Sequence, residues 1–408
     1  MAELNAGDTA WLLVATAMVM VMLPGLSLFY GGLVRRKNVL STIMHSFFGL
    51  ALVSVIWVLL GFSLAFGPDV NGAGLIGGLD FVGFANVGLE PRPEYAAGVP
   101  FVLFAAFQLM FAAITPALIS GAFAERKRFG AFVLFTIMWS ILVYSPLAHW
   151  VWAPGGWLRE LGALDFAGGT VVHISSGVSA LVAAVLIGRR WSNGDRLEPH
   201  DVPMTVLGAG LLWFGWFGFN AGSALAANGV AANALLVTNT AAGAATLTWV
   251  LASYAHRRKV SVVGAAAGAV AGLVAITPAS GFVTAGGAVL IGLAAGGVCY
   301  SATLLREKVR IDDALDVFAV HGVGGILGAL ATGILAVAAI GGVSGAIEGN
   351  LGQVGVQLIA VVAAATFAAV ATFVIVKLVE FVLGLRVEPD VEEVGLDLGV
   401  HGEAAYQP

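Results

Sequence analysis

The sequence is poor in cysteine and in charge. Its 408 residues include a single cysteine, Cys299, which excludes an intramolecular disulfide and a thiolate metal cluster. Charged residues make up only 11% of the chain, whereas 59% of its residues are hydrophobic and the mean hydropathy is +0.95. This composition lies far outside the range of soluble globular domains. The chain is therefore predicted to be an integral membrane protein.

Polar interruptions are also scarce, so most apolar runs reach 18 to 27 residues in length. Such runs match helices that cross a hydrocarbon core of about 30 Å better than the short alternating strands of a barrel. The 55 glycines favour close helix packing. We predict an all-α polytopic bundle with eleven helices, near residues 9–32, 40–66, 99–123, 130–150, 169–188, 203–222, 230–255, 260–278, 282–305, 315–340 and 352–383. The weak break at Thr277 leaves the 260–305 region open to a different division.

Basic residues indicate the orientation of these helices. Only Arg92 and Arg159 lie on one side of the predicted membrane; the other 17 of the 19 Lys and Arg residues fall on the opposite side. Those 17 are Arg35, Arg36, Lys37, Arg126, Lys127, Arg128, Arg189, Arg190, Arg196, Arg257, Arg258, Lys259, Arg306, Lys308, Arg310, Lys377 and Arg386. Because cytoplasmic loops carry the excess of positive charge, the N-terminus is predicted outside and the C-terminus inside. In a prokaryote this topology implies the inner membrane.

The end of the chain differs from the rest in composition. Residues 1–383 form the predicted transmembrane domain, and residues 384–408 form a cytoplasmic tail. The tail carries the acidic residues Glu388, Asp390, Glu392, Glu393, Asp397 and Glu403, with no apolar face worth burying. It is predicted to be a mobile acidic segment.

Two stretches of the sequence share one pattern. "VVHISSGVSA" around His173 and "AVHGVGGILG" around His321 both read V-H-x-x-x-G-x-x-small, and acidic residues precede them at Asp165 and Asp316. The histidines fall in predicted helices five and ten. This predicts an inverted repeat of helices 1–5 (about 9–188) and 6–10 (about 203–340), with an extra helix at about 352–383. Inverted repeats place their site at the interface between the halves, which would bring His173 and His321 face to face.

Several uses of two buried imidazoles are open. Each histidine could simply satisfy a hydrogen bond between helices. A closed zinc site needs four ligands, which are not available nearby, and nothing else in the helices suggests haem and electron transfer. The remaining use is polar: neutral imidazoles offer a donor and an acceptor each, and can line a path for a small hydrogen-bonding solute or relay a proton.

Aromatic residues gather toward the predicted outer side. "AHWVWAPGGW" ends helix four and "WFGWFGFNAGS" ends helix six, while Phe107 and Phe111 share one face of helix three. Interfacial aromatics usually form only an anchoring belt, and the two phenylalanines could be core. With Phe219, however, they could form a dewetted constriction, and a tryptophan with a serine outside it could bind a cation.

At this point the motifs resemble a known family along essentially the whole chain. They are "FYGGLVRRKNVLS", "FAAITPALISGAFAER", "DFAGGTVVHISSG", "GWFGFNAGSA", "DDALDVFAVHGVGG" and the tail "GLRVEPDVEEVGLDLGVHGEAAY". Their order and spacing are similar to those of the ammonium transporters of the Amt/Mep/Rh superfamily, in its bacterial Amt branch. The resemblance implies a homotrimer of eleven-helix protomers with one pore each.

The resemblance also implies roles for single residues. Phe107, Trp152 and Ser223 match the external site that recruits ammonium, Phe111 and Phe219 match the stacked gate, and His173 and His321 match the pore histidines. Asp165 matches an acidic residue that supports the site from below, and the repeat suggests Asp316 as its partner. His45 is assigned no role.

The expected function is selective transport of ammonium or ammonia for nitrogen uptake, with methylammonium as an analogue, and a PII-type signal protein as partner at the cytoplasmic tail. No enzyme activity, cofactor, metal or nucleic-acid partner is expected. Two alternatives remain: an ammonium sensor that signals through the tail, and a neutral gas channel of the Rh type, against which Trp152 and Ser223 argue.

Overall fold

The computed structural model describes residues 3–191 and 198–406, and within those residues it is helical with no strand. This confirms the all-α prediction. Arg196, one of the basic residues used above, lies outside the described residues. Ten helical stretches in the described part are long and apolar enough to cross a membrane, and α11 is a shorter apolar helix in the predicted 260–278 region.

Five spans make up the first half of the chain, and several contain a π-helical turn. The elements are α1 (Ala6–Leu33); α2 (Val39–Ile56) continued through a π-turn (Trp57–Gly61) into α3 (Phe62–Phe66); α4 (Phe101–Ile119); α5 (Phe129–Trp139) continued through a π-turn (Ser140–Tyr144) into α6 (Ser145–Trp152); the short α7 (Trp157–Glu160); and a π-turn (Gly169–Ile174) that leads into α8 (Ser175–Ile187).

The second half repeats this order. Its elements are α9 (Val202–Gly222), α10 (Gly229–Arg257), α11 (Val262–Ile276), α12 (Ala285–Val309), and a π-turn (Phe318–Gly322) that leads into α13 (Val323–Leu335). The short α14 (Ala338–Gly341), the long α15 (Gly352–Leu383), α16 (Pro389–Val394) and a final π-turn (Asp397–His401) complete the chain.

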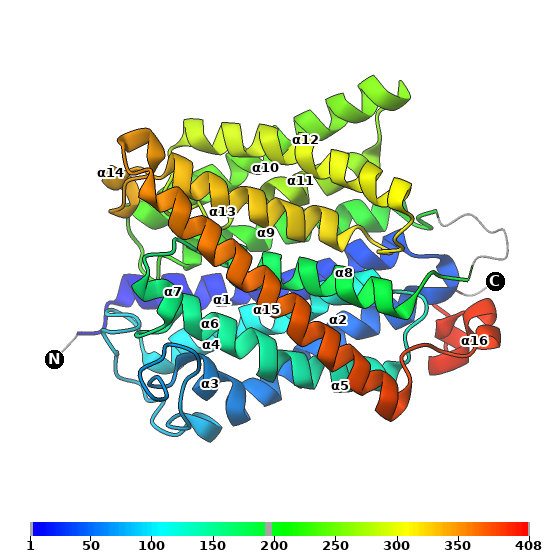
Figure 1. Ribbon diagram of the computed structural model, residues 1–408, viewed down its shortest axis with the longest axis horizontal. Helices are drawn as coiled ribbons and strands as arrows, with labels where there is room; N and C mark the ends of the chain where they lie inside the picture. The colour runs from blue at the N-terminus through cyan, green and yellow to red at the C-terminus, as the bar shows by residue number, and fades with distance from the viewer. Residues whose placement is uncertain (1–2, 192–197, 407–408) are drawn as a thin grey trace.

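The two halves lie against each other in opposite orientation (Figure 1). Their first helices, α1 and α9, pack along each other. A Cβ added at Gly208 of α9 would lie 2.2 Å from the backbone nitrogen of Phe29 in α1, so only glycine allows this approach. Their last helices, α8 and α13, run antiparallel. The evidence is the ion pair between Arg190, which follows the end of α8, and Asp312, which precedes the π-turn at the start of α13. This is the predicted inverted repeat, and α15 crosses its face over α8, α13 and α5.

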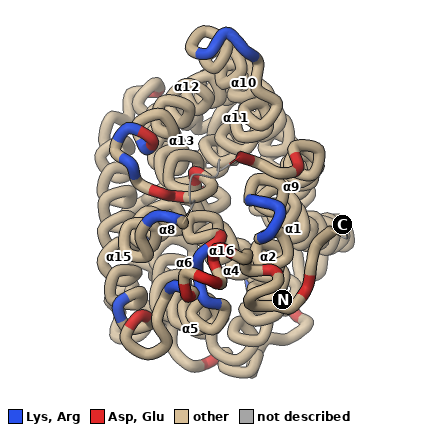
Figure 2. Tube along the Cα trace, turned by 90° about the vertical axis from the view of Figure 1, so that its right-hand side faces the viewer, with Lys and Arg blue, Asp and Glu red and all other residues tan. Residues whose placement is uncertain are grey.

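The basic loops gather at the end of the bundle that also carries the C-terminal segment, which we call the tail end. Figure 2 looks onto this end, with Lys and Arg standing on the loops around it. Arg35 and Arg190 both pair there with the buried carboxylate of Glu125. The loops that the sequence places on one side of the membrane therefore do lie together.

The tail packs against these loops. Leu396 is fully buried, and the carboxylate of Asp397 accepts hydrogen bonds from the backbone N–H groups of Leu40 and Ser41 in the first turn of α2, at 3.1 and 2.9 Å. Glu392 is also buried, where it pairs with Arg386. The prediction of a mobile tail without an apolar face to bury is therefore wrong, because free N–H groups at a helix start and a partner arginine hold acidic side chains well.

Candidate functional site

His173 and His321 lie face to face in the middle of the bundle. Their Nδ1 atoms are 3.3 Å apart, and their rings are stacked with centroids separated by 5.4 Å. Both side chains are buried, and each lies in one of the π-turns, Gly169–Ile174 and Phe318–Gly322. Single π-turns inside helices often occur at functional positions because they re-aim side chains. The structure thus brings together the pair that the repeat predicts.

The glycines of the shared motif explain why the pair can meet. A Cβ at Gly177 would lie 2.1 Å from the backbone nitrogen of Gly322, beside His321. Reciprocally, a Cβ at Gly325 would lie 3.0 Å from the backbone oxygen of Gly169 and 3.1 Å from the Cβ of His173. Each V-H-x-x-x-G motif therefore uses its glycine to admit the backbone of the other motif's histidine turn.

The hydrogen bond between the imidazoles constrains their protons. Two neutral rings that share one Nδ1···Nδ1 contact need one donor and one acceptor, so the two histidines take opposite tautomers. The Nε2 atom of His173 has no partner among the described residues. It lines a narrow apolar passage with Trp216, Phe219 and His321. A small solute in this passage can therefore exchange hydrogen bonds with an imidazole and with little else.

Stacked phenylalanines close the passage on the side facing away from the tail end, where the N-terminus of the chain lies. The rings of Phe111 and Phe219 have centroids 4.2 Å apart, and Phe219 also stacks on His173 at 6.1 Å. Phe107 packs edge-on against Phe111 at 5.0 Å and is fully buried. The predicted gate residues Phe111 and Phe219 are therefore in contact at one constriction.

A separate cavity of about 160 Å³ lies on the N-terminal side of this constriction. Of the three residues predicted to recruit ammonium, Trp152 and Ser223 line this cavity, whereas Phe107 is not among its lining residues. Phe111, which was predicted as part of the gate, lines it as well. Gln108 and Tyr95 also line it, and the sequence offered no pattern that singles them out. We call this space the outer cavity.

Hydrogen bonds orient the lining of the outer cavity. The hydroxyl of Ser223 donates to the carbonyl of Phe219 at 2.8 Å, so its oxygen keeps acceptor lone pairs for a cation. The indole of Trp152 donates to the carbonyl of Asp165 at 3.0 Å and meets the Phe111 ring edge-on at 5.9 Å. Both side chains are thereby held in place without using the groups that attract a cation.

Asp165 supports the first histidine turn from its start. Its carboxylate accepts hydrogen bonds from the backbone N–H groups of Gly168, Gly169 and Thr170, at 2.7, 2.6 and 2.7 Å, and from the Thr170 hydroxyl. Asp165 is not among the residues that line the outer cavity, the narrow passage or the larger cavity described below. Its carboxylate therefore acts as a cap for the N–H groups at the start of the helical turn.

The structural counterpart of Asp165 in the second half is Asp313, not Asp316. Asp313 is fully buried and accepts a hydrogen bond from the N–H group of Phe318 at 2.7 Å, at the start of the second histidine turn. Burial raises the pKa of Asp313, although the N–H groups of Phe318 and Val317 lower it. Asp165 and Asp313 each precede their histidine by eight residues, a spacing that identifies the pair in the sequence.

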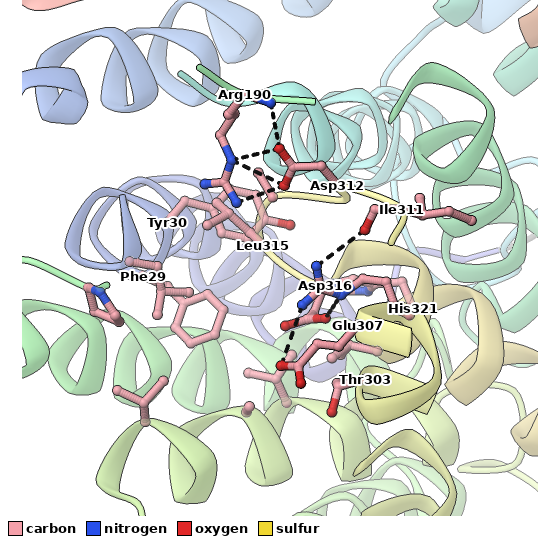
Figure 3. Close-up of a pocket in the computed structure, with 18 of the residues that line it drawn as sticks. Phe29, Tyr30, Arg190, Thr303, Glu307, Ile311, Asp312, Leu315, Asp316 and His321 are labelled. Carbon is pink, nitrogen blue, oxygen red and sulfur yellow. Dashed lines mark hydrogen bonds and ion pairs between the residues drawn. The ribbon is translucent and has the colours of Figure 1, made fainter. Parts of the chain in front are cut away.

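A larger cavity of about 550 Å³ opens on the tail side of His321 (Figure 3). Asp312 and Arg190 pair in its wall at 2.8 Å, and Asp316 pairs with Arg306 at 2.6 Å. Burial by itself would raise the pKa of Asp312, but its hydrogen bonds to Arg190 and the charge of Arg190 lower it to about 2. Burial raises the pKa of Asp316 to about 6 against the opposing charge of Arg306. We call this space the inner cavity.

The outer cavity, the narrow passage and the inner cavity follow one another, as their lining residues show. Phe111 borders the outer cavity, Phe219 and His173 border the narrow passage, and His321 borders both the passage and the inner cavity. In the described part of the chain, no group of three or more His, Cys, Asp or Glu side chains is placed to hold a metal ion.

This arrangement defines a class of protein: a polytopic helical membrane protein with a narrow passage between two halves of opposite orientation. The profile of the Ammonium Transporter Family matches residues 10–406. The ammonium transporter of Bacillus subtilis (strain 168) is 50% identical over 407 residues, covering 99% of both chains.

Solved structures agree with this match. The crystal structure of Saccharomyces cerevisiae Mep2 is similar with a TM-score of 0.89 and 39% identity, covering 95% of this chain and 88% of that one. A structure described as a sensor Amt protein has a TM-score of 0.89 and 32% identity, covering 97% and 98%. The chain belongs to the ammonium transporter family, and it is a multi-pass membrane transporter for ammonium rather than an enzyme.

Proposed function

We propose that the outer cavity recruits the ammonium ion and that the narrow passage conducts ammonia. Trp152 offers its aromatic ring and Ser223 its free lone pairs at the cavity wall. A desolvated cation–π contact contributes roughly 2 kcal/mol, which is enough to concentrate a cation at this position. Phe107 packs behind Phe111 and positions its ring.

The ion itself does not continue beyond the Phe111 and Phe219 rings. Moving an ammonium ion into an apolar passage costs tens of kcal/mol, far more than the contacts at the outer cavity return. Deprotonation at the phenylalanine gate removes this cost, and neutral ammonia then exchanges hydrogen bonds with His173 and His321. Potassium has no proton to release, so it is rejected at the same place. Asp165 and Asp313 cap the two histidine turns and hold the imidazoles in register.

The main observation that supports this proposal is the lining of the narrow passage. Its described lining is apolar except for the two imidazoles, and the unpartnered Nε2 of His173 lies in it. A lining of this kind favours a small neutral solute with both a donor and an acceptor, which describes ammonia and not a metal cation.

The test is ammonium-driven current and internal pH in proteoliposomes, with potassium as the control ion. His321→Ala should lose conduction or its selectivity over potassium. His45→Leu is the matched control, because His45 is also buried in a helix but packs on Phe132 at 4.5 Å, away from the pore. Unchanged methylammonium uptake and selectivity in His321→Ala would refute the paired-histidine mechanism. Internal alkalinisation without current would indicate electroneutral conduction of ammonia.

A second candidate function is an ammonium sensor, because one similar structure is described as a sensor Amt protein. The same sites would then bind ammonium without conducting it, and the tail would pass the signal on. Purified protein that binds ammonium but shows neither current nor internal alkalinisation would favour the sensor over the transporter.

We further propose that the tail end faces the cytoplasm of a bacterial cell and that the N-terminus lies outside. Among the described residues, most Lys and Arg positions other than Arg92 and Arg159 lie on loops at the tail end, as expected from the positive-inside rule (Figure 2). The family resemblance adds a homotrimer of eleven-helix protomers and a PII-type signal protein that docks at the tail.

Exposed apolar side chains on the tail support such docking. Val394 and Leu398 are each 56% exposed, although their neighbours Leu396 and Asp397 are buried. Leu398→Asp should weaken PII binding in a pull-down with purified proteins while leaving the buried tail contacts intact. Truncation after Val387 should abolish it, and unaltered PII binding by the truncated chain would contradict the assignment.

A further inference from the structure

The inner cavity is far more strongly charged than the passage that leads to it. Five arginines and three carboxylates line it, which leaves a formal surplus of two positive charges: Arg189, Arg190, Arg257, Arg306 and Arg310 against Glu307, Asp312 and Asp316. Ammonia needs none of these charges, and an ammonium ion on the tail side would be repelled by the surplus. Ammonia conduction therefore does not need the arginines, and the positive-inside rule requires only that they lie at the tail end, not that they face this cavity.

Two of the five arginines are neutralised within the protein. Arg190 donates from Nε and Nη2 to the carboxylate of Asp312 at 2.8 to 3.2 Å (Figure 3). Arg306 Nε lies 2.6 Å from Oδ1 of Asp316. These pairs tie the loop before the second histidine turn to α12 and to the segment after α8. They account for two carboxylates and for part of the positive charge only.

The other three arginines are different. Arg189, Arg257 and Arg310 are exposed, and within the described residues none has a hydrogen bond or an ion pair to a carboxylate. They come from three separate places: just after α8, at the end of α10 and just after α12. The fold thus brings three arginines from distant parts of the sequence to the wall of one cavity.

Favourable interaction with helix C-termini does not explain why these particular residues face the cavity. A basic residue near the end of α10 or α12 is stabilised by the helix dipole wherever its side chain points. Arg258 and Lys308 lie in the same two connections and are absent from the cavity lining. They serve the helix ends equally well, so the cavity-lining positions of Arg257 and Arg310 need a second explanation.

The remaining wall of the cavity is mostly apolar and aromatic, with Thr303 and His321 among its uncharged polar side chains. Phe29, Tyr30, Trp249 and Val270 line it, and its volume of about 550 Å³ falls within the range of small-molecule sites, roughly 300 to 1,000 Å³. Guanidinium groups bind phosphate oxygens in paired hydrogen bonds, and an aromatic wall accepts a flat ring. We propose that the inner cavity binds a nucleoside phosphate, with its phosphates held by Arg189, Arg257 and Arg310.

Binding there would affect transport, a consequence that rests on the proposed function. His321 and Phe29 border both the inner cavity and the narrow passage, so a bound nucleoside phosphate lies across the exit of the pore. Occupancy from the tail side then slows the release of ammonia, and it does so without altering the recruitment site at the other end.

Binding is tested first, on the purified full-length protein without any transport assay. Isothermal titration with ATP should give saturable binding, and Arg189→Gln, Arg257→Gln and Arg310→Gln should each weaken it at least tenfold. Arg258→Gln and Lys308→Gln are the matched controls and should weaken it less than twofold. Saturable binding that all five variants weaken equally would overturn the proposal, since a general positive surface would then explain it.

The nature of the ligand is tested with two further probes. Inorganic pyrophosphate should bind at least tenfold more weakly than ATP, because it cannot use the aromatic wall; equal affinities would overturn the nucleoside assignment. Phosphatidylglycerol in nanodiscs should leave ATP binding unchanged relative to phosphatidylcholine. Loss of ATP binding in phosphatidylglycerol nanodiscs would identify a lipid headgroup as the occupant and overturn the proposal of a soluble ligand.

The last experiment separates this inference from the proposed function. ATP enclosed in proteoliposomes, on the side of the tail end, should slow ammonium-driven transport, and Arg257→Gln should remove the inhibition while Arg258→Gln keeps it. Transport that is present but indifferent to ATP would overturn only the inhibition. Absence of transport with and without ATP would instead count against the proposed function, while the titration would still decide the site.

Discussion

The reciprocal glycine contacts between the two histidine turns lead to a graded prediction. In Gly177→Ala the new Cβ would lie 2.1 Å from the nitrogen of Gly322, about 1.3 Å short of the 3.4 Å at which contacts become ordinary. The obstructing atoms belong to backbone, so no change of side-chain rotamer can relieve the clash. Overpacking of this kind typically costs about 1 to 3 kcal/mol.

The expected functional loss is larger than the loss of stability. The Nδ1 atoms of His173 and His321 are 3.3 Å apart, and a separation of half the missing 1.3 Å already takes them beyond hydrogen-bond distance. We therefore expect Gly177→Ala to reduce ammonium-driven transport at least tenfold, together with a lower midpoint of thermal unfolding.

Two further alanine variants complete the series. Gly325→Ala meets its neighbours at 3.0 and 3.1 Å, so a shift of a few tenths of an ångström relieves it, and a partial loss of transport is expected. Gly243→Ala in α10 meets nothing within 4 Å and should transport normally, with a gain of about 1 kcal/mol in helix stability. Transport at the wild-type rate in a correctly folded Gly177→Ala protein would refute the reasoning, since it would show that the two turns need not approach so closely.

Three other predictions concern charged groups outside the membrane-spanning segments, and thermal unfolding in detergent measures all of them. Asp165→Asn replaces one acceptor by a donor that faces backbone N–H groups, so a loss of about 2 kcal/mol is expected; an unchanged midpoint would contradict its role as a cap. The pKa of Asp312 is lowered from 3.8 to about 2, so its pairing with Arg190 contributes about 2 kcal/mol above pH 4, and this is lost as the pH falls toward 2. Asp312→Asn should remove that part of the acid sensitivity, and an identical pH profile would count against the pair. Lys127 is buried beneath the tail with its amine 3.6 Å from the centre of the Phe123 ring, and burial lowers its pKa well below the usual value. Because the unfolded chain then binds more protons, Lys127→Met should stabilise the protein at pH 7, with a smaller gain at higher pH; a clear loss would show that the cation–π contact outweighs desolvation.

Much of the architecture could be predicted from local patterns. Apolar run length indicated the spans, and the shared V-H-x-x-x-G motif indicated both the inverted repeat and the meeting of His173 with His321. These predictions succeeded because a lipid environment forces long helices to satisfy their own backbone, so that hydropathy alone carries the signal.

Predictions that depended on side-chain direction were less successful. Phe107 and Phe111 share a helix face, yet only Phe111 lines the outer cavity. Asp316 is the acidic residue nearest to His321, yet Asp313 caps the histidine turn and Asp316 pairs with Arg306. Spacing along the chain indicates which residues can lie close to the site. The geometry of the turn decides which of them faces it.

By itself the sequence determined the class of this protein, because composition, run length and the placement of basic residues leave only a polytopic helical bundle. It also indicated the paired histidines, since two copies of one motif in opposite orientation can face each other at the interface between the halves, and the structure shows that they do. Only the tertiary structure decided how the tail docks and which arginines around the inner cavity have no carboxylate partner within the described part of the chain. Both depend on distances between segments that lie far apart in the chain, such as Arg189, Arg257 and Arg310 at the ends of three different helices, and no local pattern encodes such distances.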